Sequence, residues 1–175
     1  MGETNFANEL EALQRWCTTA ASLASFHAGQ APTELVRPVV EFKPPYRERD
    51  RNRDRYVYVN KVIQYGVLYV ATLAQGMSLQ DKLFSSLEEA MGRIPVYGLV
   101  DDGRGGQQEG IIAWLFDARL EFQTAAGLDI PFTLTYYVSY TRTRPINPPP
   151  ASFVGTRVKG QIDNRNYNFA NYPKE

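Results

Sequence analysis

Two segments of the chain alternate apolar and polar residues with a period of two, as strands with one buried face do. In residues 111–123 the even positions are apolar, and from residue 117 onward the odd positions are polar. Residues 132–141 alternate in the same way, and the segment TAAGLDI lies between the two. We therefore predict an antiparallel hairpin, whose first strand buries Ile112, Trp114, Phe116, Ala118, Leu120 and Phe122.

Two other segments have the spacing of three and four residues that is typical of amphipathic helices. In residues 6–21 the apolar stripe consists of Phe6, Leu10, Leu13, Cys17 and Ala20. The second segment begins at Ser78, a predicted N-cap, and ends at Gly92. Between them a large apolar residue recurs every four positions, at Leu79, Leu83, Leu87 and Met91.

The remaining segments before residue 142 are strand-like or irregular. A run rich in Val, Ile and Tyr from Tyr56 to Leu73 predicts a long strand, in which Gly66 marks a bulge or a bend. Residues 94–100 predict a short strand, and residues 101–110 predict a glycine-rich loop. The prolines of residues 31–45 leave room for at most a short strand.

These elements predict an α+β fold in residues 1–141. It consists of a mostly antiparallel sheet, an N-terminal helix and a second helix packed on the sheet. Residues 142–175 form a separate C-terminal segment rich in Pro, Asn and Tyr. Two interpretations of this segment stay open, a loose terminus or an ordered, extended arm that docks along a neighbour. The anchors of such an arm would be Phe153, Tyr167, Phe169 and Tyr172.

The composition is that of a globular protein without a strong electrostatic bias. Of the 175 residues 43% are hydrophobic, and 19 basic residues balance 19 acidic ones. This balance argues against a general grip on nucleic-acid phosphates, because dedicated binders carry a basic excess. No secretory signal and no apolar run of about 18 residues stands out, so we expect an intracellularly made protein that is not inserted in a membrane.

The residue types needed for catalysis are sparse. The single histidine, His27, is expected to be a capping or loop residue, and Cys17 lies on the apolar stripe of a predicted helix. Neither a zinc site nor a Ser-His-Asp arrangement is supported. The glycine cluster after Asp101 and Asp102 leads into a strand, whereas a phosphate-binding loop leads into a helix. We expect no catalytic residue, no metal ligand and no cofactor.

The segment RERDRNRDR, residues 47–55, is the most unusual stretch of the chain. Arginines occupy every odd position, namely Arg47, Arg49, Arg51, Arg53 and Arg55, and three acids leave a net charge of +2. If the segment continues the strand that starts at Tyr56, all five arginines share one face. Such a face would suit contact with another subunit or with phosphates, and a solvated loop is the plain alternative.

The order of the elements resembles that of the tail terminator and neck proteins of tailed bacteriophages. The stretches that carry the resemblance are ELEALQRWCTTA, RPVVEFKPP and YGVLYVATLAQGMSLQDKLFSSLEE, within residues 6–141. The strand segment GLDIPFTLTYYVSYT is also similar to strands of virion proteins. The likeness lies in the architecture, and the chain carries no diagnostic motif of this family.

The resemblance implies a structural role in the virion. Subunits of the family form a ring, commonly of six copies, that caps the tail tube and joins it to a head-side connector, while DNA passes through the lumen without specific binding. The five arginines would then face a neighbouring subunit or the lumen. The loop with Asp101, Asp102 and Arg104 would face a partner ring. Such a protein is made in the host cytoplasm and ends in the tail or neck of the particle.

Two other functions remain alternatives. A single-stranded nucleic-acid module would stack bases on Tyr56, Tyr58 and Tyr65 beside the arginines. An enzyme or small-molecule binder would need a site assembled from scattered polar residues, and the scarcity of histidine together with the lack of a phosphate loop argues against it. A ring protein is expected to show a discrete oligomer and little affinity for DNA.

Overall fold

A computed structural model describes residues 6–52, 57–124 and 127–141 of the chain. Their helices and strands follow one another in the order α1 (Phe6–Ala21), β1 (Ala24–His27), η1 (Ala28–Gln30), β2 (Val39–Phe42), β3 (Tyr46–Asn52), β4 (Val57–Tyr69), α2 (Leu73–Glu89), β5 (Ile94–Asp101), β6 (Gln107–Phe122) and β7 (Asp129–Thr141). The predicted α+β class, with a mostly antiparallel sheet and two α-helices, is confirmed. The predicted C-terminal segment, residues 142–175, lies outside the described residues.

The strands form one seven-stranded sheet with the order β1-β2-β4-β7-β6-β5, and β3 also pairs with β4. Only β1 and β2 pair in parallel among these strands, and the long β4–β7 ladder forms the middle of the sheet. Strands β2 and β3 run along the same edge of β4, separated by Lys43 and two prolines. The predicted antiparallel hairpin of β6 and β7 is confirmed.

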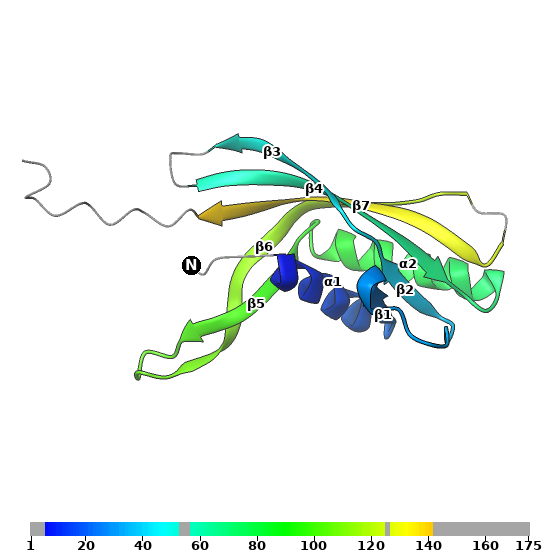
Figure 1. Cartoon of the computed structure of the whole chain (residues 1–175), viewed down its shortest axis with the longest axis horizontal. Helices are drawn as coiled ribbons and strands as arrows, with labels where there is room; N and C mark the ends of the chain where they lie inside the picture. Colours follow the sequence, from blue (N-terminus) through cyan, green and yellow to red (C-terminus); the bar gives the residue numbers. More distant parts are fainter. Residues whose placement is uncertain (1–5, 53–56, 125–126, 142–175) are drawn as a thin grey trace, which may run out of the picture. The chain divides into compact units, whose positions relative to one another are not determined.

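Both helices lie on one side of the curled sheet (Figure 1). Helix α1 contacts β1, β5 and α2, and α2 also contacts β6. The core forms where these helices meet the inner side of the sheet, around Leu13, Leu83, Leu115 and Leu134. On the other side of β4 and β7, Figure 1 shows no described element. Among the described elements, the helices thus cover one face of the sheet, and none covers the other face.

The N-cap of helix α2 lies six residues before the predicted one. This cap is Thr72, whose hydroxyl accepts a hydrogen bond from the Gln75 backbone at 3.1 Å. The Gln75 side chain in turn accepts from the Ala71 backbone at 2.8 Å. This reciprocal arrangement resembles a capping box, and the sequence T-L-A-Q carries its signature. The prediction that Ser78 caps the helix is wrong because the stronger cap lies upstream.

Two irregularities in β6 change which sequence positions face the core along the strand. The register with β5 shifts beside Ile112, and the register with β7 shifts around Asp117, which has φ +51°. Leu115 is therefore buried, whereas Trp114 is 37% exposed. The prediction of a single buried face at the even positions is wrong, although Ala118 and Leu120 are buried as expected.

Gly66 allows a close approach between strands and does not mark a bulge, since the β4–β7 register continues through it without a shift. A Cβ atom at this position would clash with the ring of Phe132 and lie 2.8 Å from the carbonyl oxygen of Glu41. The expected bulge is thus wrong. A glycine is needed at residue 66 because the Phe132 ring occupies the space that a side chain there would fill.

We expect Gly66→Ala to lower the free energy of unfolding by about 1–3 kcal/mol, because the added methyl group overpacks the β4–β7 contact. Urea unfolding followed by circular dichroism measures this. Gly127→Ala is the matched control, since a Cβ there meets nothing within 4 Å, and it should change stability by less than about 0.5 kcal/mol. Equal unfolding midpoints for the two variants would contradict this role of Gly66.

Candidate functional site

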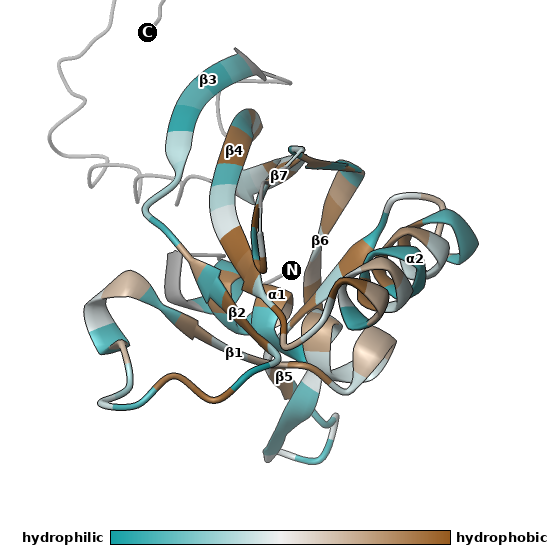
Figure 2. Cartoon of the chain, turned by 90° about the vertical axis from the view of Figure 1, so that its right-hand side faces the viewer, coloured by the Kyte–Doolittle hydropathy of each residue, from teal (hydrophilic) through white to brown (hydrophobic). Residues whose placement is uncertain are grey.

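The arginine segment folds back along the next strand instead of extending it. Strand β3 pairs with β4 in antiparallel register, with Arg47 opposite Val62 and Arg49 opposite Asn60. The hypothesis that the arginine segment continues the strand from Tyr56 is therefore wrong for residues 47–52, and residues 53–55 lie outside the described residues. Figure 2 shows β3 as a hydrophilic strand. Charged residues on an edge strand of this kind discourage pairing with other chains.

The described part of the arginine segment does not keep one regular alternation. A register shift lies between Arg49 and Arg51, so the simple alternation ends after Arg49. Opposite residues of an antiparallel pair lie on the same face, and Val62 belongs to the core. Arg47 and Arg49 therefore lie on the inner side of the sheet. Arg53 and Arg55 are outside the described residues, and a role of the segment in subunit or lumen contact stays a prediction.

Arg47 belongs to a buried polar cluster with Glu9, Tyr136 and Tyr140. Glu9 is 1% exposed although it carries a carboxylate. Arg47 donates to Glu9 Oε1 at 2.6 Å and to the Tyr140 hydroxyl at 3.0 Å. Tyr136 donates to Glu9 Oε1 at 3.0 Å, and Tyr140 donates to Glu9 Oε2. The cluster thus joins the start of α1 to β3 and β7.

The electrostatics of this cluster follow from its burial. Burial raises the pKa of the Tyr136 and Tyr140 hydroxyls, and the nearby Glu9 charge raises both further. For Arg47 burial acts to lower the pKa, but the charge and hydrogen bond of Glu9 outweigh it and the pKa is raised. Every carboxylate oxygen of Glu9 is already hydrogen-bonded within the subunit. The cluster can hold the fold together but has little capacity for an external ligand.

The tyrosines of the alternative nucleic-acid platform do not form one surface. Tyr58 and Tyr65 are seven residues apart on a regular strand, so they lie on opposite faces of the sheet. The Tyr58 ring stacks on Tyr140 with centroids 5.6 Å apart, and the Arg49 guanidinium lies 3.9 Å from its centroid. Tyr56 is outside the described residues. A continuous stacking surface for bases is absent from the described part of β4.

The loop between β5 and β6 is stabilised by its own aspartates. Asp101 accepts a hydrogen bond from the Gly103 backbone, and Asp102 accepts from the Arg104 and Gly106 backbones at 2.7 and 2.9 Å. The backbone hydrogen bond from Arg104 has the largest effect on the pKa of Asp102 and lowers it, and the hydrogen bond from Gly106 lowers it further. The loop is shorter than predicted because β5 continues to Asp101 and β6 begins at Gln107. Its orientation toward a partner stays a prediction.

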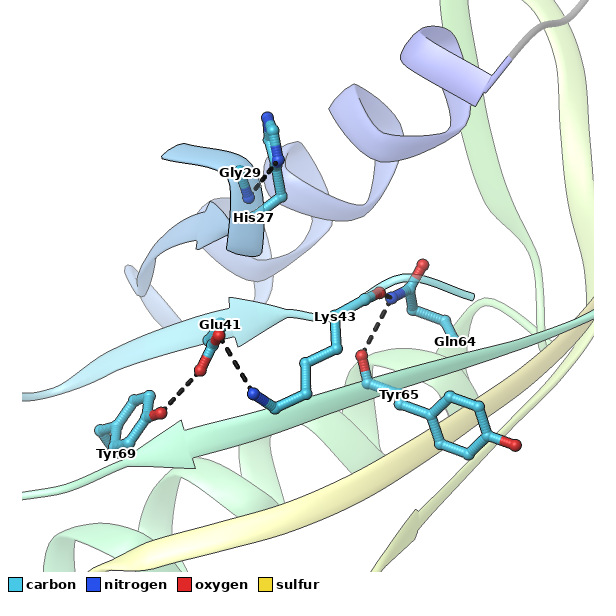
Figure 3. Close-up of polar contacts among 7 residues, drawn as sticks. All are labelled: His27, Gly29, Glu41, Lys43, Gln64, Tyr65 and Tyr69. Carbon is cyan, nitrogen blue, oxygen red and sulfur yellow. Dashed lines mark hydrogen bonds and ion pairs between the residues drawn. The ribbon is translucent and has the colours of Figure 1, made fainter. Parts of the chain in front are cut away.

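His27 and Cys17 have structural roles. The Nδ1 atom of His27 accepts a hydrogen bond from the Gly29 backbone at 3.2 Å and caps η1, as Figure 3 shows. Cys17 is buried, and burial raises its thiol pKa to about 12. The predicted capping and core roles are confirmed. Within the described ranges, no group of three or more His, Cys, Asp or Glu side chains could hold a metal ion.

The uncovered face of the sheet is the surface that the sequence patterns did not reveal. We call it the outer face, and its centre consists of Ile63, Tyr65 and Val67 on β4 with Thr133, Thr135 and Tyr137 on β7. Tyr46 of β3 lies opposite Ile63, and Phe116 of β6 lies opposite Tyr137 and stacks on it at 6.0 Å. Tyr46 is 52% exposed and Tyr65 is 42% exposed. The centre of this face carries no charge.

Charged residues of the outer face lie at its borders, and those along β2, β3 and the two ends are paired within the subunit. At one end Lys61 approaches Glu48 at 4.0 Å, and at the other Arg37 contacts Asp129 at 2.8 Å. Figure 3 shows Glu41 between Lys43 and Tyr69, with the Tyr69 hydroxyl donating at 2.6 Å. The bond to Glu41 raises the pKa of Tyr69 to about 12. At the β6 border Arg119 and Glu121 lie opposite Thr135 and Thr133 and make no ion pair among the described residues. A neutral centre and a charged rim are typical of protein interfaces.

Nearby, buried Gln64 fixes the point where β2 gives way to β3. Its amide donates to the carbonyl oxygens of Lys43 and Tyr65, the latter at 2.9 Å (Figure 3). The Lys43 backbone donates to the Tyr65 carbonyl at 2.9 Å. These bonds satisfy polar groups beside the two prolines, which cannot donate.

Comparison with protein-family models finds no matching family, and comparison with curated proteins finds no matching relative. Among the described residues, no helix is long and apolar enough to cross a membrane. The predicted arm anchors Phe153, Tyr167, Phe169 and Tyr172 lie outside the described residues. The outer face and the buried cluster are therefore interpreted from their own geometry.

We expect Arg47→Met to lower the free energy of unfolding by about 3–5 kcal/mol, because it leaves the Glu9 carboxylate buried without its cation. Combining it with Glu9→Gln should cost less than the sum of the two single changes. A double-mutant cycle by urea unfolding measures the difference. The control is Arg15→Met, which removes exposed ion pairs with Glu11 and Glu109 and should cost much less than Arg47→Met, because exposed ion pairs contribute little to stability. Additive effects of Arg47→Met and Glu9→Gln would rule out the coupling.

Stability should fall at alkaline pH because the folded state raises the pKa of Tyr136 and Tyr140 above the ordinary value of 10.0. A raised pKa gives stability that is fully present below about pH 10 and is lost as the pH rises further, by up to about 1.4 kcal/mol per pH unit for each group. Urea unfolding at a series of pH values measures this loss. Tyr136→Phe should show a shallower decline, and an identical decline in both proteins would contradict the assignment.

Proposed function

We propose that this protein is a structural subunit that assembles with copies of itself into a ring. The observation that carries the proposal is the outer face, which presents a neutral centre of Tyr, Thr, Ile and Val on the uncovered side of the sheet. An antiparallel sheet that faces water normally places polar and charged residues on that side. A face without central charges, rich in tyrosine, is instead typical of a surface that another protein covers.

The dimensions of the outer face support this role. The β4–β7 ladder joins 13 residue pairs, a length of about 43 Å at ~3.3 Å per residue. Four neighbouring strands at ~4.8 Å spacing give a width of about 19 Å, and hence an area of roughly 800 Å². This projected area is large enough for a standard protein interface, in which each partner buries about 800 Å² of accessible surface.

The resemblance to bacteriophage tail terminators and neck proteins suggests a position for the ring in a virion. The order of an N-terminal helix, a proline-containing segment, a long strand, a second helix and antiparallel strands is present in the structure. In this proposal the ring caps the tail tube of the virion and contacts a head-side connector. DNA passes through the lumen without specific binding, in keeping with balanced basic and acidic residues.

The proposal predicts that the purified protein forms a discrete oligomer at high concentration, seen by light scattering and as a ring by negative-stain microscopy. Tyr65→Lys combined with Thr135→Lys should give a folded monomer, because it places two charges in the centre of the outer face. The control is Gln30→Lys in exposed η1, which should assemble like wild type. A wild-type protein that stays monomeric up to near-millimolar concentration would contradict self-assembly, as would full assembly of the double variant.

A further inference from the structure

A second uncovered apolar surface lies on α2. Leu73, Met77 and Phe84, followed by Met91 just beyond the helix, recur at spacings of four and seven residues and so share one side. They are 64%, 72%, 43% and 78% exposed, respectively. The adjoining side of α2, which faces the sheet, buries Leu79, Leu83 and Leu87 in the core. We call the exposed set the α2 stripe.

The α2 stripe is flanked by two recesses that could accept side chains of a partner. One recess of about 650 Å³ lies between Phe84, Met91 and the middle of β6. The other, of about 300 Å³, lies between Met77 and Phe122. Between the two recesses, the rings of Phe84 and Phe122 pack edge to face with their centroids 5.6 Å apart. This surface is therefore uneven, unlike the broad outer face.

The α2 stripe and the outer face lie on different sides of the sheet, because α2 packs against its inner side (Figure 1). A twofold contact brings the same patch of two copies together and would leave one of the two surfaces uncovered. A head-to-tail contact covers both surfaces with one interface, and its repetition closes a ring. Helix on sheet is also one of the standard layer packings of protein cores.

We propose that the α2 stripe of one copy packs on the outer face of the next copy, so that each subunit supplies the missing helix layer of its neighbour. This inference rests on the proposed self-assembly and names the surfaces that carry it. The 17 residues of α2 span about 25 Å at ~1.5 Å per residue. That length fits within the roughly 43 by 19 Å of the outer face.

The charges beside the two surfaces are complementary. Asp81 and Glu88 flank the α2 stripe, and within the described residues neither makes an ion pair. At the β6 margin of the outer face, Arg119 lies opposite Thr135, and Arg93 stacks on Trp114 at 4.7 Å. Glu121, opposite Thr133, adds one acid, so the two arginines leave this margin with a net charge of +1. An acidic flank on the helix can thus meet a basic margin on the sheet of the next copy.

The test mixes two variants that are each defective on one surface. The face variant carries Tyr65→Lys and Thr135→Lys, and the stripe variant carries Met77→Lys and Met91→Lys. Each alone should be a folded monomer by circular dichroism and native mass spectrometry. Their mixture should give a one-to-one heterodimer that does not grow, because the intact stripe of the first variant docks on the intact face of the second. Ser78→Lys, on another side of α2, is the control and should assemble like wild type.

Each of the other possible results of this experiment contradicts a specific part of the proposal. If the wild type assembles but the stripe variant assembles equally well, the α2 stripe is not in the interface and the inference is overturned. If both variants are monomers but their mixture contains no heterodimer, the contact is not head-to-tail through these surfaces. If the wild type itself stays monomeric, the proposed self-assembly fails together with the inference. Measuring the wild type first therefore separates the two failures.

Discussion

The fold depends on a single buried carboxylate, Glu9, which lies in the first helix and has all its partners elsewhere. A charge of this kind is costly to bury, and only several well-placed donors can compensate it. Here Arg47 comes from β3, and Tyr136 and Tyr140 come from β7. The position of α1 under the sheet and the attachment of β3 to its edge are therefore coupled through one group. Hydrophobic packing around Leu13 could tolerate small shifts, whereas these hydrogen bonds require one geometry.

The elements with strong local patterns could be predicted from the sequence. Helix α1, the β6–β7 hairpin and the capping role of His27 follow from periodicity and from local hydrogen bonding. The start of α2 could also be predicted from the sequence, since Thr72 and Gln75 have the spacing of a capping box. Even the separation of Tyr58 from Tyr65 by an odd number of residues shows that a single strand cannot present both on one face.

Other features could not be predicted because they depend on distant parts of the chain. The irregularities at Ile112 and Asp117 arise where β6 changes its partner from β5 to β7, and no local signal marks them. The inward direction of Arg47 is set by the register of β3 and by the buried acid that it meets. The outer face could not be predicted because its threonines and tyrosines alternate with apolar residues, as the residues of a solvated face do. Its neutral character becomes visible only when β4 and β7 lie side by side.

The central place of β7 has a consequence for how the chain folds as it is synthesised. This strand lies between β4 and β6, and its hydroxyls reach Glu9 across 127 and 131 residues of sequence. On the ribosome α1 emerges well before β7, so its buried carboxylate meets two of its partners only after residue 140 has been added. Contacts of such large sequence separation form late and slow folding. The described part of the chain thus reaches its native arrangement only after β7 has been synthesised and completes the sheet.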